Sequence, residues 1–191
     1  MGYLNNVTGY RDDLLANRAI VKHGNFALLT PDGLVKNIIP GFENCDATIL
    51  STPKLGASFV DYLVTLHQNG GNQQGFGGEG IETLLYVISG NITAKAEGKT
   101  FTLSEGGYLY CPPGSLMTFV NAHAEDSQIF LYKRRYVPVE GHAPWLVSGN
   151  ACELERIHYE GMDDVILLDF LPKELGFDMN MHILSFAPGA S

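Results

Sequence analysis

The sequence lacks the residue patterns that identify many kinds of active site. Its three cysteines, Cys45, Cys111 and Cys152, are odd in number and far apart, which excludes a disulfide framework and a Cys-x-x-Cys pair. It has no Ser-His-Asp order, no glycine-rich phosphate loop and no zinc-type Cys/His spacing. We therefore expect reduced thiols in a cytoplasmic protein, without a catalytic motif of these classes.

Positive charge and long apolar runs are also scarce. Twelve Lys and Arg residues stand against 21 Asp and Glu, a net charge of −9, and the longest basic run is Lys133 to Arg135. This balance disfavours nucleic acid or an anionic membrane surface as a partner. No segment has the length of a transmembrane helix, and the first twenty residues lack the apolar stretch of a signal peptide.

Glycine, proline and apolar residues are plentiful. The 191 residues include 22 Gly and 9 Pro, and 45% are apolar, which is typical of an all-β globular protein. This length allows one generous domain or one and a half small ones.

The stretch from Gly71 to Asn121 shows the predicted architecture best. Leu84 to Ile88 is a short apolar strand, and Asn91 to Ala96 pairs with Thr100 to Leu103 about a polar turn. Gly and Pro mark each corner. Short strands at this spacing predict a jelly-roll barrel.

The spacing of the glycines and prolines in this stretch resembles the cupin family, whose fold is a double-stranded β-helix. The matching scaffold positions are Gly71, Gly90, Gly106, Pro112, Gly114 and Asn121. The family places His, His, Glu and His at four metal-binding positions, and here these hold Gly77, Glu79, Thr83 and Met117. A transition metal needs several converging N or O donors, so the barrel is expected to be metal-free.

Five residues are candidates for lining a pocket. Glu79 and Glu82 flank the mouth of the barrel and could form a general acid/base pair, although two carboxylates in a glycine-rich loop are usually solvated. His67 could line a pocket, but a lone histidine is more often structural. Tyr86, together with Tyr110, Met117 and Phe119, is expected to fill the barrel; a small apolar ligand there is not indicated.

His182 belongs to a possible second copy of the fold. The segments 59–71 and 178–190 are both alternating strands that enter a small glycine-containing loop, about 119 residues apart. His182 could line the active-site cavity of this second unit. We predict an N-terminal arm at 1–30, with helical turns at 10–18, a first cupin barrel at 31–136, a linker at 137–158, and the opening strands of an incomplete second cupin at 159–191.

Over the whole chain, including TPDGLVKNIIPGF, LGASFVDYLVTL and LSFAPGAS, the sequence is similar to bicupin (S)-ureidoglycine aminohydrolases of the enterobacterial type. The resemblance implies hydrolysis of (S)-ureidoglycine to (S)-ureidoglycolate and ammonia in allantoin and purine degradation. It also implies a manganese ion in the second cupin, a metal-free first barrel and a homo-oligomer.

The family's metal ligands correspond to positions beyond Ser191, so the resemblance transfers no catalytic residue to this chain. We expect the 191-residue chain to hold no manganese and to be inactive alone. Two alternatives remain open. The barrel could be a structural or oligomerisation module, or it could be a cupin that binds a small molecule without metal.

Overall fold

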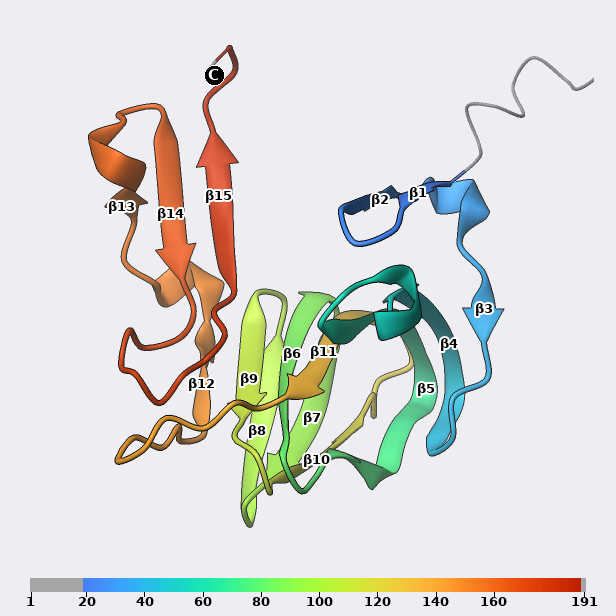
Figure 1. Ribbon diagram of the computed structural model, residues 1–191. Helices are drawn as coiled ribbons and strands as arrows, with labels where there is room; N and C mark the ends of the chain where they lie inside the picture. Colours follow the sequence, from blue (N-terminus) through green and yellow to red (C-terminus); the bar gives the residue numbers. More distant parts are fainter. Residues whose placement is uncertain (1–18, 190–191) are drawn as a thin grey trace, which may run out of the picture.

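The computed structural model of the protein describes residues 19–189, and nearly all of the regular structure is β (Figure 1). This confirms the predicted fold class. The predicted helical turns at 10–18 lie outside the described residues. The strands are β1 (Ile20–Lys22), β2 (Phe26–Leu28), β3 (Lys36–Asn37), β4 (Phe42–Ser51), β5 (Phe59–Gly77), β6 (Ile81–Ser89), β7 (Asn91–Ala96), β8 (Lys99–Ser104), β9 (Gly107–Cys111), β10 (Leu116–Val120), β11 (Ser127–Arg135), β12 (Val147–Asn150), β13 (Ile157–His158), β14 (Val165–Asp169) and β15 (His182–Phe186). The remaining elements are four short 3₁₀ turns, η1 (Pro31–Gly33), η2 (Pro53–Leu55), η3 (Ala151–Glu153) and η4 (Tyr159–Gly161).

Strands β3 to β12 form one barrel-like sheet, in the order β12-β9-β6-β11-β5-β10-β7-β8. The long strand β5 organises it, because β4, β10 and β11 all pair with β5 in antiparallel register. The hairpin β7–β8 turns at Glu97 and Gly98, which both have positive φ, as the sequence predicts.

Alternation along the strands separates two faces of this sheet. The inward residues form the barrel core, which includes Val64 and Leu66 of β5, Leu85 and Val87 of β6, and Leu131 of β11. Each of these five side chains is completely buried. Their burial is the main stabilising contribution to the barrel.

The strand predicted at 59–67 continues to Gly77, through a glycine-rich stretch that interrupts the alternating pattern. Gly71 shows why glycine is needed there: a Cβ at this position would lie 2.0 Å from the carbonyl oxygen of Phe119 on β10. The glycine therefore allows two backbones to approach closely without ending the strand.

Part of the predicted linker at 137–158 belongs to the barrel. Residues 147–150 form β12, which pairs with β9 from Val147↔Tyr110 to Asn150↔Gly107. Asn150 fixes the end of β12, since its side chain donates to the carbonyl of Glu105 and accepts from the backbone N–H of Cys152. The linker prediction is wrong at these residues, because short strands at a sheet edge carry little alternating pattern.

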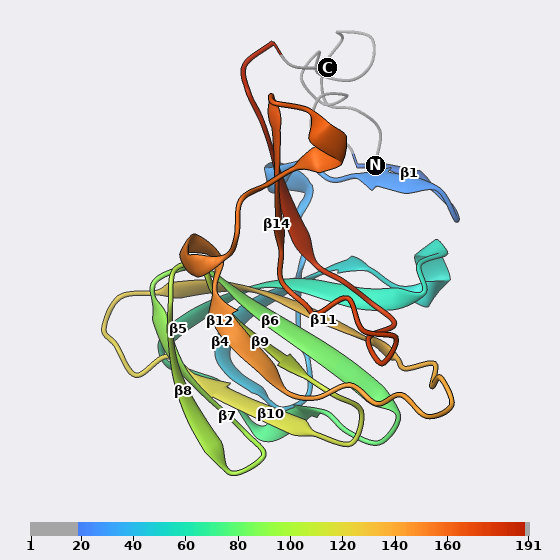
Figure 2. The ribbon, with the colours of Figure 1, turned by 90° about the vertical axis from the view of Figure 1, so that its left-hand side faces the viewer.

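The C-terminal residues form a second, three-stranded antiparallel sheet in the order β13-β14-β15 (Figures 1 and 2). It packs against the outer face of the barrel through a second apolar cluster, in which Phe170 contacts Tyr108 and Tyr86 edge to face. Tyr86 and Tyr110 belong to this cluster, whereas Met117 and Phe119 lie in the barrel core. The prediction that all four fill the barrel is therefore wrong for the two tyrosines, which face outward from their strands.

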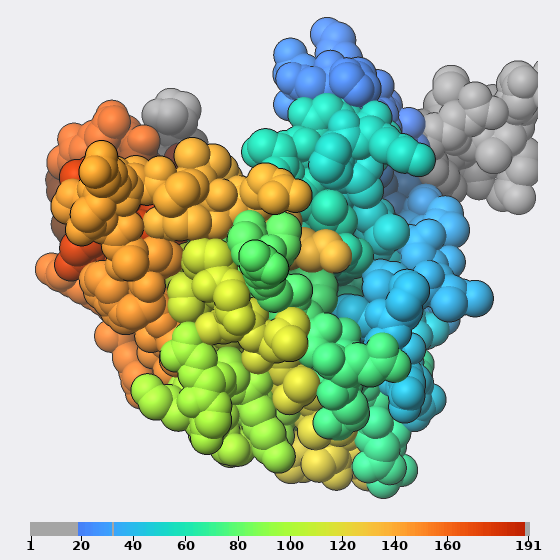
Figure 3. Space-filling view, turned by 60° about the horizontal axis from the view of Figure 1, so that its bottom comes forward, coloured from blue at the N-terminus to red at the C-terminus, as the bar shows by residue number. Residues whose placement is uncertain are grey.

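No helix within residues 19–189 is long and apolar enough to cross a membrane. In the space-filling view, the orange chain after β11 runs along the surface beside the red C-terminal segment (Figure 3). Residues 176–181 pack against the outer face of β6, β9 and β11. We call this contact the junction.

Candidate functional site

The position of the cupin metal centre is packed with side chains that do not fit a metal ion. Thr83 and Met117 are both completely buried, and Met117 lies in the barrel core. Gly77 has a φ of +112°, and a Cβ there would lie 2.8 Å from the carbonyl oxygen of Ser115. A histidine at position 77 would therefore be strained as well as crowded.

The donor chemistry at this position is also unsuitable. Glu79 is exposed, and Thr83 pairs across the sheet with Cys111, whose pKa is raised to about 12 by burial. A protonated thiol is not a metal ligand. Among residues 19–189, no group of three or more His, Cys, Asp or Glu side chains could hold a metal ion.

The sequence suggests that Glu79 and Glu82 lie together at the mouth of the barrel, as an acid/base pair or as solvated carboxylates. The structure shows a different environment for Glu82. It lies on β6, is completely buried, and faces the junction. Tyr110 of β9 donates a hydrogen bond to Glu82 Oε2 at 2.7 Å, and Arg134 Nε of β11 lies 3.5 Å from Glu82 Oε1. Glu82 and Arg134 are direct neighbours in the β6–β11 register.

Asp178 brings a second carboxylate to the same cluster from the C-terminal segment. Its Oδ2 lies 3.3 Å from Arg134 Nη2 and accepts a hydrogen bond from the backbone N–H of Val137 at 2.8 Å. Arg134 Nη1 also donates to the Asp178 carbonyl, and the Tyr136 hydroxyl donates to the carbonyl of Gly176. These contacts attach the segment to the barrel at several points.

Burial and the nearby Asp178 raise the pKa of Glu82 to about 8. Burial and the hydrogen bond to Glu82 also raise the pKa of Tyr110 far above its ordinary value, so the phenol stays protonated and remains the donor. The sequence contains no signal for this cluster, because Asp178 is far from Glu82 along the chain and becomes its neighbour only through the packing of the C-terminal segment.

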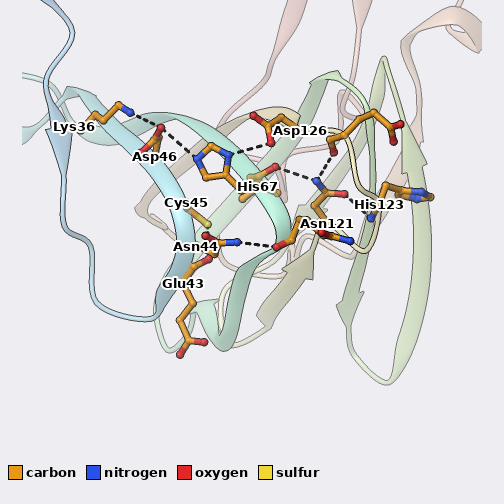
Figure 4. A network of polar contacts seen from close by, with 12 residues as sticks. Lys36, Glu43, Asn44, Cys45, Asp46, His67, Asn121, His123 and Asp126 are labelled. Carbon is orange, nitrogen blue, oxygen red and sulfur yellow. Dashed lines mark hydrogen bonds and ion pairs between the residues drawn. The ribbon is translucent and has the colours of Figure 1, made fainter.

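His67 takes part in a separate, exposed polar network on the barrel (Figure 4). Its Nδ1 lies 3.0 Å from Asp126, its Nε2 lies 3.3 Å from Asp46, and Lys36 bonds to Asp46. Asp126 and Asp46 raise the pKa of His67. The network links β3, β4 and β5 to the loop before β11, which agrees with a structural role for His67.

His182 lies at the start of β15, opposite Asp169 of β14, and is exposed. It lines a cavity of about 300 Å³ between the C-terminal segment and the outer face of β5 and β11, together with Asp61, Tyr132 and Asn180. This cavity lies outside the first barrel. The assignment of His182 to an active-site cavity of a second cupin stays a prediction.

The barrel and its sheet order are those of a cupin. The family model of the EutQ-like cupin domain matches residues 55–136. Protein Ylba from E. coli, in a crystal structure, is similar with a TM-score of 0.86 and 92% identity, over 96% of this chain and 73% of that one.

Two relatives make the assignment more specific. The (S)-ureidoglycine aminohydrolase of Escherichia coli (strain K12) is 97% identical over all 191 residues, which cover 73% of its length. The probable (S)-ureidoglycine aminohydrolase of Oryza sativa subsp. japonica is 31% identical over 173 residues, 90% of this chain and 54% of that protein. The chain belongs to the (S)-ureidoglycine aminohydrolase family, within the cupins.

Proposed function

We propose that this chain acts in the hydrolysis of (S)-ureidoglycine to (S)-ureidoglycolate and ammonia, with its first barrel as a metal-free structural module. The identity of 97% with the E. coli (S)-ureidoglycine aminohydrolase, over the whole chain, carries the proposal. In this reaction water supplies the new oxygen, the bond from carbon to the amino nitrogen breaks, and that nitrogen leaves as ammonia. The partner is thus a small molecule, and neither nucleic acid nor a membrane is needed.

We further propose that catalysis depends on manganese bound in the part of the E. coli relative that this chain does not cover. The donor set at Gly77, Glu79, Thr83 and Met117 argues against a metal in the first barrel. The packed core likewise favours a structural role over the binding of a small apolar ligand inside the barrel. We infer a cytoplasmic homo-oligomer, in agreement with its acidic charge and unpaired cysteines.

The test combines metal analysis with an ammonia-release assay on (S)-ureidoglycine. The 191-residue chain is compared with the longer E. coli relative, prepared and loaded with manganese in the same way. We expect bound manganese and ammonia release from the relative, and neither from the 191-residue chain. Stoichiometric manganese in the 191-residue chain would overturn the location of the metal, and ammonia release without a metal would overturn the metal dependence.

A further inference from the structure

The junction contains more carboxylates than cations. Two carboxyl groups, Glu82 and Asp178, lie beside a single guanidinium, Arg134, and Glu82 is completely buried. A buried carboxylate pair with one counter-charge is unfavourable if both groups are ionised, because like charges at close range repel strongly in a medium of low dielectric constant.

The two carboxyl groups also have fewer hydrogen-bond donors around them than their four oxygens could use. One oxygen of each is satisfied: Glu82 Oε2 by Tyr110, and Asp178 Oδ2 by the backbone N–H of Val137. The other two oxygens, Glu82 Oε1 and Asp178 Oδ1, are buried and accept no hydrogen bond within residues 19–189, although Arg134 Nε lies 3.5 Å from Glu82 Oε1. The two carboxyl groups converge on the same guanidinium, with Glu82 Oε1 3.5 Å from Arg134 Nε and Asp178 Oδ2 3.3 Å from Arg134 Nη2. A hydrogen bond between two carboxyl groups requires a proton on one of them.

We propose that Glu82 and Asp178 share one proton across the junction, and that loss of this proton weakens the attachment of residues 176–181 to the barrel. The proton supplies the missing donor and leaves one negative charge opposite Arg134. The other ionisable groups that face the pair are Tyr110 of β9, Tyr132 of β11 and Tyr136 after it. All three tyrosines have raised pKa values and stay neutral while the carboxyl pair titrates.

The attachment matters for the C-terminal sheet because residues 176–181 lead directly into β15. Phe177 packs against Tyr110 and against Trp145, with ring centroids 5.4 Å and 4.7 Å apart. Met181 accepts a backbone hydrogen bond from Phe170 through its carbonyl. The position of Asp178 therefore sets where the last strand begins.

The direction of the pH effect follows from the proton balance. The pKa of Glu82 is about 8 when the segment is attached, against an ordinary value of 4.5. Between these values the attached form binds a proton that the detached form releases. The stabilisation is complete below about pH 4.5, declines as the pH rises, and is lost above about pH 8, with up to about a tenfold change in the equilibrium constant per pH unit.

Trp145 is the only tryptophan in the chain and contacts Phe177 edge to face, so its fluorescence reports the attachment. The experiment measures the urea midpoint of the Trp145 signal from about pH 5 to about pH 9, with circular dichroism as the probe of the barrel. In the native chain we expect the midpoint to fall as the pH rises and to level off near pH 8.

Two substitutions distinguish a proton shared between Glu82 and Asp178 from a pKa of Glu82 that is raised by burial alone. Glu82→Gln removes the titrating group and keeps a donor, so the fall in the midpoint should be lost relative to the native chain. Asp178→Asn removes the second carboxylate and leaves Glu82 beside Arg134, so the fall should become smaller than in the native chain, although burial still raises the pKa of Glu82. Glu79→Gln, at an exposed position, serves as the control and should keep the native profile.

Infrared difference spectra give an independent readout of the proton. At neutral pH we expect the carbonyl band of a protonated carboxyl group in the native chain, and its loss in Glu82→Gln. A native chain without this band, or a Glu82→Gln variant with the native pH profile, would overturn the proposal. An unchanged profile in Asp178→Asn would also overturn it, since burial alone would then hold the proton on Glu82.

Discussion

His67 lies between two carboxylates that come from different parts of the barrel, Asp46 on β4 and Asp126 in the loop before β11. Because both acids raise its pKa, the charged imidazole stabilises the fold at low pH. The contribution is complete below the pKa of histidine in the unfolded chain and is lost as the pH rises through the raised pKa of the folded state.

The variant His67→Gln tests this ion pair. We expect its Tm to lie below that of the native chain at about pH 6, by no more than about 3 °C because the pair is exposed. The difference should decrease as the pH rises through the raised pKa of His67 and be smaller at about pH 9 than at about pH 6. Thermal unfolding followed by circular dichroism gives both values, and an equal difference at the two pH values would contradict the role of the charge.

Met117 occupies the place of a metal-binding histidine, and it can be used to test whether the packed centre could accept a metal. Met117→His should lower the free energy of unfolding by about 2–4 kcal/mol, because it buries an imidazole beside apolar side chains. Met117→Leu is the matched control and should cost less than about 1.5 kcal/mol. Urea unfolding with and without Mn²⁺ or Zn²⁺ measures both, and stabilisation of Met117→His by either ion would show that the centre is not lost.

The Asn150 side chain anchors the end of strand β12 at the barrel edge, in addition to the backbone pairing of β12 with β9. Asn150 bonds to the Glu105 carbonyl and to the Cys152 N–H, so Asn150→Ala removes both contacts. We expect a loss of about 1–2 kcal/mol and faster amide hydrogen exchange in β12 and β9. Ser148→Ala, at an exposed position of the same strand, should leave exchange unchanged. Equal exchange in the two variants would mean that backbone pairing alone holds the strand.

The strands that the sequence predicts best have a clear apolar or alternating pattern and end at Gly. The hairpin β7–β8 and strand β6 are of this kind, whereas only His182–Phe186 of the alternating segment predicted at 178–190 forms a strand. Strand β12 and the distal part of β5 were missed because backbone pairing with neighbours distant in sequence forms them, with little pattern in their side chains. The orientation of Tyr86 and Tyr110 was wrong for a related reason: both faces of the sheet are buried, so hydrophobicity does not indicate which face points into the barrel.

The same limit applies to the candidate site. The residue types at the four cupin metal positions can be read from the sequence, because they stand at fixed spacing within one motif. The burial of Glu82 could not be predicted, because it depends on Arg134 and Asp178, which the fold brings to it from β11 and from the C-terminal segment. A local pattern therefore shows which side chains stand at motif positions, whereas a polar cluster between two packed units is visible only in the assembled chain.

The C-terminal sheet leaves apolar side chains exposed on the face that carries His182. Leu184 and Phe186 of β15 are 37% and 60% exposed, and within residues 19–189 β15 pairs with β14 alone. An unpaired strand edge beside exposed apolar residues favours pairing with another chain. We therefore expect the 191-residue chain to associate with a second copy through β15.

Phe186→Glu should shift this association toward the monomer by placing a charge on the exposed face, without changing the circular dichroism of the barrel. Glu79→Gln, on the exposed loop before β6, is the control and should sediment as the native chain does. Sedimentation velocity at several concentrations measures the shift. A native chain that is monomeric throughout would contradict the association, and a Phe186→Glu variant that associates equally well would place the contact between copies away from β15.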